Sequence, residues 1–276
     1  MFSPGSDAKR RVQPVIIATM NISAYAERIH YTQHLKPDVE TLHGLHMAHM
    51  RSIPFENLDI SLKHPIKIDQ DSIWSKLITQ KRGGFCYELN GLFAWLLKQT
   101  GFEVTFLNAR VFNRAGDLGI DFDHLALLVK MPDQSMPWLA DVGFGDSFNE
   151  PLRFDEVGEQ VQGLRAYRLE KTPDGFITWQ KNYDGSWERL YFFDLQPHKF
   201  PEEYELACLY HQTSPTSSFT RKSIISKATA EGRISLEDGR LILTTNGQRT
   251  ERPLQSQEEY ERLLKADFDI TLPLEI

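Results

Sequence analysis

The first hundred residues carry apolar positions at the spacing of helices. Between Pro37 and Pro54, apolar residues recur every three or four positions, and the same spacing returns in segments that start near Ser72 and at Cys86. Side chains at this spacing lie on one face of an α-helix, which a globular protein buries. The pattern therefore predicts a helical region that extends to about Thr100.

After residue 101 the pattern changes to that of strands. The predicted strands are Val104–Phe112, Leu125–Val129, Trp138–Phe144, Tyr167–Leu169, Phe176–Trp179 and Trp187–Phe193. The pairs Asp174–Gly175 and Asp184–Gly185 lie between such runs, and this dipeptide favours tight hairpins because glycine accepts a positive φ. An antiparallel sheet or a small barrel is predicted.

The last third of the chain mixes both kinds of element. A hairpin is predicted from Arg233–Leu236 and Leu241–Thr245, which flank Asp238–Gly239. A helix is predicted from Ser256, which with Glu259 has the spacing of a capping box. Helical, β and mixed regions therefore follow one another, as in an α+β fold.

Composition and charge exclude several classes of protein. Of the 276 residues, 41% are apolar and 25% are charged, which is typical of a globular chain with room for two or three compact units. The net charge of −7 argues against binding to nucleic acid or to anionic lipid. No apolar run approaches the ~20 residues of a membrane-spanning helix, so we expect no membrane partner.

The chain has two cysteines, which excludes a disulfide framework and fits a reducing cytoplasm. Cys208 is interpreted as a buried apolar residue, the usual role of an isolated cysteine. Cys86 differs, because it follows the pair Gly83–Gly84 at the start of a predicted helix. A helix N-terminus lowers the pKa of a thiol from about 8.5 towards about 3.5–7.5, so we expect a reactive thiolate.

A nucleophilic cysteine needs an imidazole, and a carboxylate or amide that orients it. His124 starts one apolar strand and Asp141 lies inside another, which makes them the candidates. Taken alone, His124 is more often a strand-end residue satisfied by backbone, and Asp141 is more often a turn acceptor at the end of a strand, before the glycines. His43, His46 and His49 recur on one predicted helix, and we interpret them as a solvated face and not as a metal site.

Three separated motifs resemble one enzyme family. Arg82–Asn90, with Pro54–Leu58 before it and Asp141–Gly145 after it, closely resembles the arylamine N-acetyltransferases. The resemblance spans about Ile22 to Phe219 and includes the segment Thr213–Phe219. It implies an N-terminal helical bundle, a central antiparallel β-barrel and a C-terminal α/β lid, built around a core like that of the cysteine proteases.

With these three parts we expect a mobile extension at residues 1–19, the bundle with the nucleophile at 20–102, the barrel with the histidine and aspartate at 103–205, and the lid at 206–276. The resemblance also implies roles for single residues. The implied catalytic triad is Cys86, His124 and Asp141. The implied acceptor-pocket residues are Phe55, Val111, Phe144 and Phe219. The implied neighbours of coenzyme A are Gly143, Gly145, Thr213, Ser214 and Ser217. Arg82 and Glu56 are expected to pair and so to hold the loop that presents Cys86, and Asn57 is expected to be a structural support.

The implied activity is acetyl-CoA-dependent acetylation of arylamines and arylhydrazines through an acetyl-cysteine. Acetyl-CoA would be a cosubstrate, the acceptor a small aromatic amine or hydrazine, and no metal would take part. Thiol proteases and transglutaminase-like enzymes also use a Cys–His–Asp set. A macrolactam-forming amide synthase of the same architecture and a catalytically silent binding domain are further alternatives.

Overall fold

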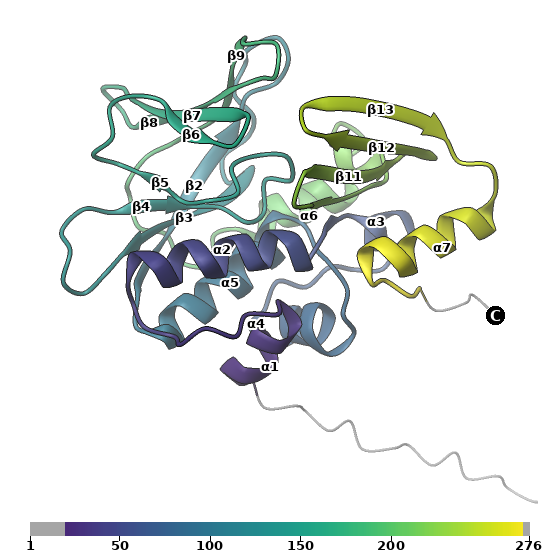
Figure 1. Ribbon diagram of the computed structural model, residues 1–276, viewed down its shortest axis with the longest axis horizontal. Coiled ribbons are helices and arrows are strands. Elements are labelled where there is room, and N and C mark those ends of the chain that lie inside the picture. The colour runs from purple at the N-terminus through teal and green to yellow at the C-terminus, as the bar shows by residue number, and fades with distance from the viewer. Residues whose placement is uncertain (1–19, 273–276) are drawn as a thin grey trace, which may run out of the picture.

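The computed structural model describes residues 20–272 of the chain. The expected N-terminal extension, residues 1–19, lies outside the described residues. Helices come first, an eight-stranded sheet follows, and a five-stranded sheet with a helix completes the chain (Figure 1). This arrangement confirms the predicted α+β fold class. Within residues 20–272, no helix is both long and apolar enough to cross a membrane.

Side chains cap the starts of two predicted helices. Asp38 accepts a hydrogen bond from the backbone N–H of Thr41, and Asp69 accepts one from Ser72. The helices of the N-terminal region are α1 (Ile22–Arg28), α2 (Val39–Ser52), α3 (Leu58–Ser61), α4 (Gln70–Trp74), which continues as a π-helical turn (Ser75–Thr79), and α5 (Cys86–Thr100). Gly101 ends α5 with φ 100°, a left-handed conformation that glycine adopts without steric cost.

The eight-stranded sheet is antiparallel and nearly closes into a barrel, in the order β5-β4-β3-β2-β9-β8-β7-β6. Its strands are β2 (Glu103–Val111), β3 (His124–Lys130), β4 (Trp138–Ala140), β5 (Leu152–Arg153), β6 (Gln160–Gln162), β7 (Arg165–Lys171), β8 (Phe176–Lys181) and β9 (Trp187–Phe193). Between β5 and β6, the Gln160 side chain exchanges hydrogen bonds of 2.8 and 2.9 Å with the backbone of Arg153. Side chains therefore bridge the last gap of the barrel.

The five-stranded sheet takes its first strand from the helical part of the chain. It has the order β1-β10-β11-β12-β13, and Phe55 of β1 lies opposite Ser226 of β10. Its strands are β1 (Phe55–Glu56), β10 (Ile224–Ala228), β11 (Gly232–Glu237), β12 (Arg240–Thr245) and β13 (Gln248–Pro253), and α6 (Glu205–Thr213), a short 3₁₀ helix (Ser218–Thr220) and α7 (Gln257–Phe268) accompany it. The division at residues 102 and 205 remains our proposal, and β1 crosses it.

Helix α5 packs at the centre of the molecule. Leu89, Leu92, Phe93, Leu96 and Leu97 are fully buried, as their spacing predicted. The helix contacts α1 and α4 of the helical region and β2 and β3 of the barrel. Burying each such side chain contributes about 1.5–3 kcal/mol, so α5 is a firm support for its first residue, Cys86.

The strand predicted at Trp138–Phe144 is shorter than expected. β4 ends at Ala140, and Asp141 is the first residue after it. The Asp141 carboxylate accepts a hydrogen bond of 2.9 Å from the backbone N–H of Gly143. This local bond competes with a strand ladder and turns the chain into the bends that follow.

Candidate active site

A crowded turn presents Cys86 at the start of α5. The backbone N–H of Glu56 donates to the carbonyl of Gly84 at 2.9 Å, which joins the turn to β1. A Cβ atom on Gly83 would lie 2.2 Å from the carbonyl oxygen of Pro54, so only glycine fits there. Cys86 itself is buried, with 3% of its surface exposed.

The pKa of Cys86 differs in direction from the sequence-based expectation. Burial raises the pKa of this thiol well above its ordinary value, and a hydrogen bond with the backbone of Leu125 opposes that rise only in part. The carboxylates of Asp123 and Asp141 raise it further. The expected lowering was wrong because it considered the helix N-terminus and not the loss of water. Cys86 therefore needs a base to become a thiolate.

His124 and Asp141 lie together as predicted. The ring Nε2 of His124 is 2.7 Å from Oδ2 of Asp141, and both side chains are buried. Because a carboxylate accepts, Nε2 carries the proton and Nδ1 keeps a lone pair. Burial raises the pKa of Asp141, but the charge and hydrogen bond of His124, with those of Asn90 and Gly143, bring the pKa below its ordinary value. Leu125, the residue after His124, is the backbone partner of the Cys86 sulfur.

Asn90 joins Asp141 to the helix that begins with Cys86. Its Nδ2 donates to Oδ1 of Asp141 at 2.8 Å and to the carbonyl of Leu125 at 2.6 Å. Its Oδ1 accepts from the N–H of Val142 at 2.9 Å. A Cβ on Gly143 would lie 2.8 Å from Cα of Cys86, so this glycine packs directly on the backbone of Cys86. Asn90 was part of the recognised motif, but its contacts were not predicted.

His46 supports Asp141 from α2. Its Nε2 accepts from the backbone N–H of Asp141 at 3.1 Å, and its Nδ1 donates to the carbonyl of Asn149 at 2.7 Å. Burial lowers its pKa to about 4, so the ring is neutral. The expectation of a solvated face was wrong for His46 and His49, which are fully buried. Their spacing from Leu42, four and seven positions, is the signal that could have shown this.

Three of the predicted pocket residues are aromatic. Phe144 lies beside His124, whereas Phe55 and Phe219 lie together near the turn before Cys86. The ring of Phe144 meets the ring of His124 edge-on, with centroids 5.3 Å apart. The rings of Phe55 and Phe219 are 6.0 Å apart, and a Cβ on Gly145 would lie 3.9 Å from the Phe55 ring. Val111 ends β2, and its N–H donates to the carboxylate of Asp123 at 3.2 Å.

The three hydroxyl residues expected beside coenzyme A lie around the end of α6. Thr213 bonds the carbonyl of Leu209 at 2.8 Å, and Ser214 bonds Thr216 at 2.8 Å. Ser217 is buried, and its Oγ accepts from the N–H of Phe219 at 3.2 Å. Ser217 therefore serves a local turn, whereas Thr213 is exposed and Ser214 is half-buried.

Comparison with known proteins identifies the family. A family model described as N-acetyltransferase matches residues 38–276. The arylamine N-acetyltransferase pineal gland isozyme NAT-3 of Gallus gallus is 34% identical over 278 residues, which cover 92% of this chain and 95% of that protein. The chain belongs to the arylamine N-acetyltransferase family.

Bacterial members of this family agree in sequence and in fold. The arylamine N-acetyltransferase of Mycolicibacterium smegmatis is 34% identical over 233 residues, which cover 83% of this chain and 84% of that protein. The Mycobacterium marinum arylamine N-acetyltransferase, solved in complex with CoA, is 27% identical and has a TM-score of 0.84 over 91% of this chain and 93% of that chain. The three-part fold implied by the sequence motifs is thus shared with members of the family.

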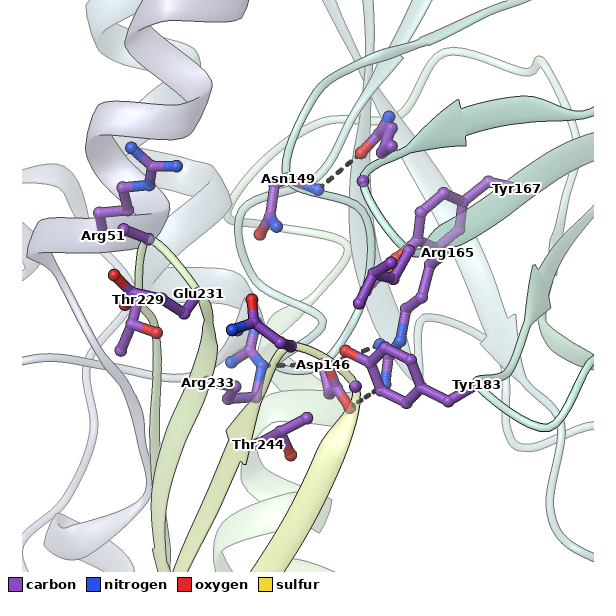
Figure 2. A pocket seen from close by; sticks show the side chains of 18 residues that line it. Arg51, Asp146, Asn149, Arg165, Tyr167, Tyr183, Thr229, Glu231, Arg233 and Thr244 are labelled. Atoms are coloured by element: carbon purple, nitrogen blue, oxygen red, sulfur yellow. Dashed lines mark hydrogen bonds and ion pairs between the residues drawn. The ribbon is translucent and has the colours of Figure 1, made fainter.

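A polar cavity of about 190 Å³ lies between the barrel and the five-stranded sheet (Figure 2). Asp146 accepts bonds of 2.8 and 2.9 Å from Arg165 of β7 and one of 3.0 Å from Arg233 of β11. None of the predicted site residues is among the described residues that line this cavity. Asp146, Arg165 and Arg233 therefore join the two sheets, and the cavity that they line is not part of the candidate active site.

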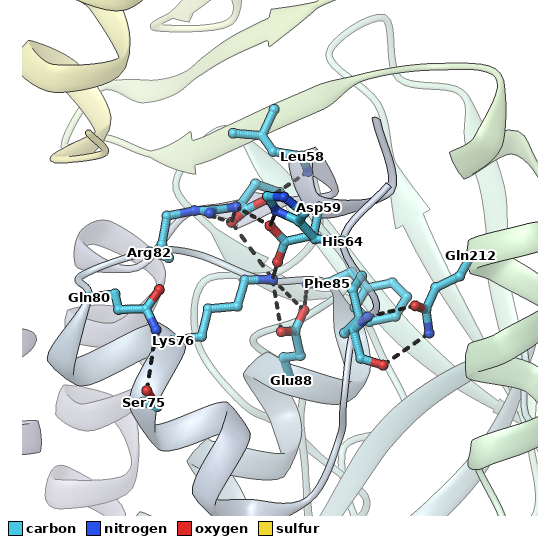
Figure 3. A network of polar contacts seen from close by, with 12 residues as sticks. Leu58, Asp59, His64, Ser75, Lys76, Gln80, Arg82, Phe85, Glu88 and Gln212 are labelled. Carbon is cyan, nitrogen blue, oxygen red and sulfur yellow. Dashed lines mark hydrogen bonds and ion pairs between the residues drawn. The ribbon is translucent and has the colours of Figure 1, made fainter. Parts of the chain in front are cut away.

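Figure 3 shows Asp59, Lys76, Arg82 and Glu88 near the turn that presents Cys86. Together with Glu56, these buried side chains form a group of five charged residues. We call them the charged network. Arg82 Nη2 is 2.7 Å from Glu56 Oε1 and 3.0 Å from Asp59 Oδ1. Lys76 Nζ is 2.7 Å from Asp59 Oδ2 and 2.9 Å from Glu88 Oε1. The Arg82–Glu56 pair implied by the motifs is present and buried.

Glu88 connects the charged network to the start of α5. Its Oε2 accepts from the backbone N–H of Phe85, the residue before Cys86, at 3.1 Å. Burial raises the pKa of Glu88 to about 7, because Lys76 opposes this effect only in part and the carboxylate of Glu56 adds to it. Three carboxylates share two cations, so one carboxylate of the network is easily protonated.

Asn57 fastens the segment after α6 to β1. Its Nδ2 donates to the carbonyls of Phe219 at 3.1 Å and Lys222 at 2.6 Å, and its Oδ1 accepts from the N–H of Ile224 at 2.8 Å. All three of these side-chain hydrogen bonds reach the C-terminal third, so Asn57 supports the segment that contains Phe219.

Among residues 20–272, no group of three or more histidine, cysteine or acidic side chains is placed to hold a metal ion.

Proposed function

We propose that the protein transfers an acetyl group from acetyl-CoA to Cys86 and then to the nitrogen of an arylamine or arylhydrazine. The observation that carries this proposal is the chain of hydrogen bonds from His124 through Asp141 to Asn90. Asn90 belongs to the helix that begins with Cys86, so one helix carries the nucleophile and orients the base. We place the activity in the cytoplasm, whose reducing conditions keep both cysteines as thiols.

The resting thiol of Cys86 passes its proton to Nδ1 of His124. Asp141 holds the proton on Nε2, so that Nδ1 is the basic nitrogen, and its negative charge stabilises the imidazolium that forms. The charged pair can form in this buried place because thiolate and imidazolium neutralise each other. Proton transfer therefore compensates for the raised pKa of the thiol.

In the donor half-reaction, the thiolate attacks the carbonyl carbon of acetyl-CoA. The tetrahedral intermediate collapses, the bond to the sulfur of coenzyme A breaks, and that sulfur takes the proton from His124. The backbone N–H groups at the start of α5 are candidates to stabilise the oxyanion, a contribution of roughly 3 kcal/mol per donor. Acetyl-Cys86 and free coenzyme A are the products.

In the acceptor half-reaction, the amine nitrogen attacks the acetyl carbon of acetyl-Cys86. His124 accepts the proton of the amine, the bond between the acetyl carbon and Cys86 breaks, and the sulfur is protonated again. Anilines and arylhydrazines suit this step because they are neutral at pH 7 and enter an apolar place without losing hydration of a charge. The rings of Phe55, Phe144 and Phe219 are the proposed surface for the aromatic part of the acceptor.

The test is to mix the protein with acetyl-CoA alone and to follow intact mass and the release of coenzyme A. One acetyl group per chain, absent in Cys86→Ala, is the expected result. Cys208→Ala is the matched control, because burial raises the pKa of Cys208 to about 12 and its thiol also lies in the core, so this variant should still acquire the adduct. Aniline should then discharge the adduct, and an alkylamine should do so far more slowly.

A protein that gains no acetyl group and releases no coenzyme A contradicts the proposal. An adduct that anilines do not discharge would point to an amide synthase, whose acceptor is built into its own substrate. Cleavage of peptides without consumption of acetyl-CoA would point to a thiol protease.

A further inference from the structure

A second histidine–aspartate pair lies next to the candidate active site. Nε2 of His211, on α6, is 3.1 Å from Oδ1 of Asp123, the residue immediately before His124. Both side chains are largely buried, with exposed fractions of 6% and 16%. As in the pair His124–Asp141, Nε2 faces the carboxylate. The proposed mechanism does not use this second pair.

Asp123 is the point at which several segments meet. Its Oδ2 accepts from the N–H of Val111 at the end of β2, at 3.2 Å. Its carbonyl lies 3.2 Å from Nε2 of His211 and 3.3 Å from the hydroxyl of Tyr87, which follows Cys86. A Cβ on Gly119 would lie 2.2 Å from Oδ2, so the loop before β3 closes tightly over this carboxylate. Its position thus affects Val111 and the start of β3 together.

The other side of His211 faces the segment with Phe219. Its Nδ1 is 3.3 Å from Oγ of Ser217, which in turn accepts from the N–H of Phe219. The rings of His211 and Phe219 meet at 71° with centroids 5.2 Å apart. The order Ser217–His211–Asp123 has the residue types of a hydrolase triad. Ser217 is buried and its oxygen already serves Phe219, so we assign the set a positioning role.

We propose that His211 is a positioning residue that holds Val111, Phe219 and the start of β3 together as one wall of the acceptor site. Val111 depends on it through Asp123, and Phe219 depends on it through Ser217 and ring contact. This inference rests on the proposed function, because it assigns an acceptor to that wall. Loss of His211 should therefore weaken the use of the amine more than the acetylation of Cys86.

The experiment compares His211→Leu, which keeps volume and removes both ring nitrogens, with His211→Gln, which keeps a donor for Asp123. We expect His211→Leu to raise the KM for aniline about tenfold, the change that loss of one hydrogen bond to a charged group produces. The rate of Cys86 acetylation by acetyl-CoA alone should change by less than about threefold, since one positioning contact on the acceptor side is lost. His211→Gln should restore most of the KM.

Asp123→Asn tests the other member of the pair. If His211 acts through Asp123, the variant that combines His211→Leu with Asp123→Asn should raise the KM for aniline little more than His211→Leu alone. The two substitutions remove the same interaction, so their effects should not add. His43→Leu is the matched control: Nδ1 of His43 lies 3.3 Å from Glu150 in another histidine–carboxylate pair, on α2. It should leave the KM for aniline at the wild-type value.

Amide hydrogen exchange supplies a readout that does not depend on activity. In His211→Leu, the peptides that contain Val111 and Phe219 should exchange faster than in the wild type and in His43→Leu. Unchanged exchange, equal KM values for the Leu and Gln variants, or equal losses in both half-reactions would overturn the positioning role. A wild-type protein that forms no adduct would refute the proposed function instead, and the exchange result would still decide whether His211 positions this wall.

Discussion

Two buried polar clusters flank the first turn of α5, and they are built in opposite ways. Around Asp141, the hydrogen bonds come from the side chains of His124 and Asn90 and from backbone N–H groups. In the charged network, ion pairs join the carboxylates to Lys76 and Arg82. The cluster whose charge changes in the proposed mechanism is thus held by hydrogen bonds, and the cluster behind the turn is held by salt bridges.

Two carboxylates show how this difference works. Asp141 accepts three hydrogen bonds, which bring its pKa below the ordinary value although burial acts against them. Glu88 is equally buried but shares Lys76 with two other carboxylates, and its pKa rises to about 7. Burial alone therefore does not decide whether a carboxylic acid is charged. Here the acid with its own hydrogen-bond donors stays charged, and the acid that shares its cation has the raised pKa.

The largest expected effect comes from Asp141→Asn. The amide would donate to Nε2 of His124, which forces the ring proton onto Nδ1 and removes the base for Cys86. We expect the rate of Cys86 acetylation to fall by roughly 10³–10⁴ while the fold persists, since the amide oxygen still accepts from Asn90 and Gly143. Adduct formation by intact mass and thermal unfolding measure the two effects. A variant that acetylates Cys86 at nearly the wild-type rate would contradict the assigned role of Asp141.

A smaller effect, on stability, is expected from Arg82→Ala. Removing Arg82 takes the bonded cation from Glu56 and leaves Lys76 to balance the three carboxylates of the charged network. Breaking a buried ion pair in this way costs about 3–5 kcal/mol of unfolding free energy. Arg153→Ala is the matched control, since the Arg153–Asp155 pair has the same kind of contact at 2.8 Å on the surface. It should change the unfolding free energy far less, because solvent screens an exposed ion pair. Urea unfolding measures both variants, and equal losses would show that burial of the Arg82 pair does not matter.

The smallest expected effect comes from Glu88→Gln, which should change how the unfolding free energy depends on pH. The folded protein raises the pKa of Glu88 to about 7, so its contribution to stability is complete below the unfolded value near 4.3 and is lost as pH rises through 7. Between pH 5 and 8.5, the wild type should lose on the order of 3 kcal/mol relative to the variant. Urea unfolding at several pH values tests this. Glu170→Gln, an exposed control, should follow the wild type, and parallel curves for Glu88→Gln would contradict the prediction.

Elements with a strong apolar pattern were predictable from the sequence, and polar ones were not. Helix α5 and strand β3 carry such patterns and lie where they were expected. β13 is exposed along its whole length and carries no apolar alternation, so nothing in its sequence marks it as a strand. β1 has two residues and is held by its neighbours, β10 on one side and the turn at Gly84 on the other. Such elements depend on tertiary contacts and not on local propensity.

The same limit applies to the site. Residue types and order were sufficient to choose Cys86, His124 and Asp141. The direction of the Cys86 pKa was mispredicted because it depends on burial, which the local sequence does not contain. The pair His211–Asp123 joins residues 88 positions apart, and no spacing rule connects them.

Strand β1 has a consequence for the order in which the molecule is assembled. Phe55 and Glu56 pair with Ser226 and Ile225, and Glu56 also binds the turn before Cys86. Chains are made from the N-terminus, so Cys86 leaves the ribosome long before β10, the strand that pairs with β1, has been synthesised. The turn before Cys86 therefore gains its complete set of neighbours only after the C-terminal third of the chain has been made.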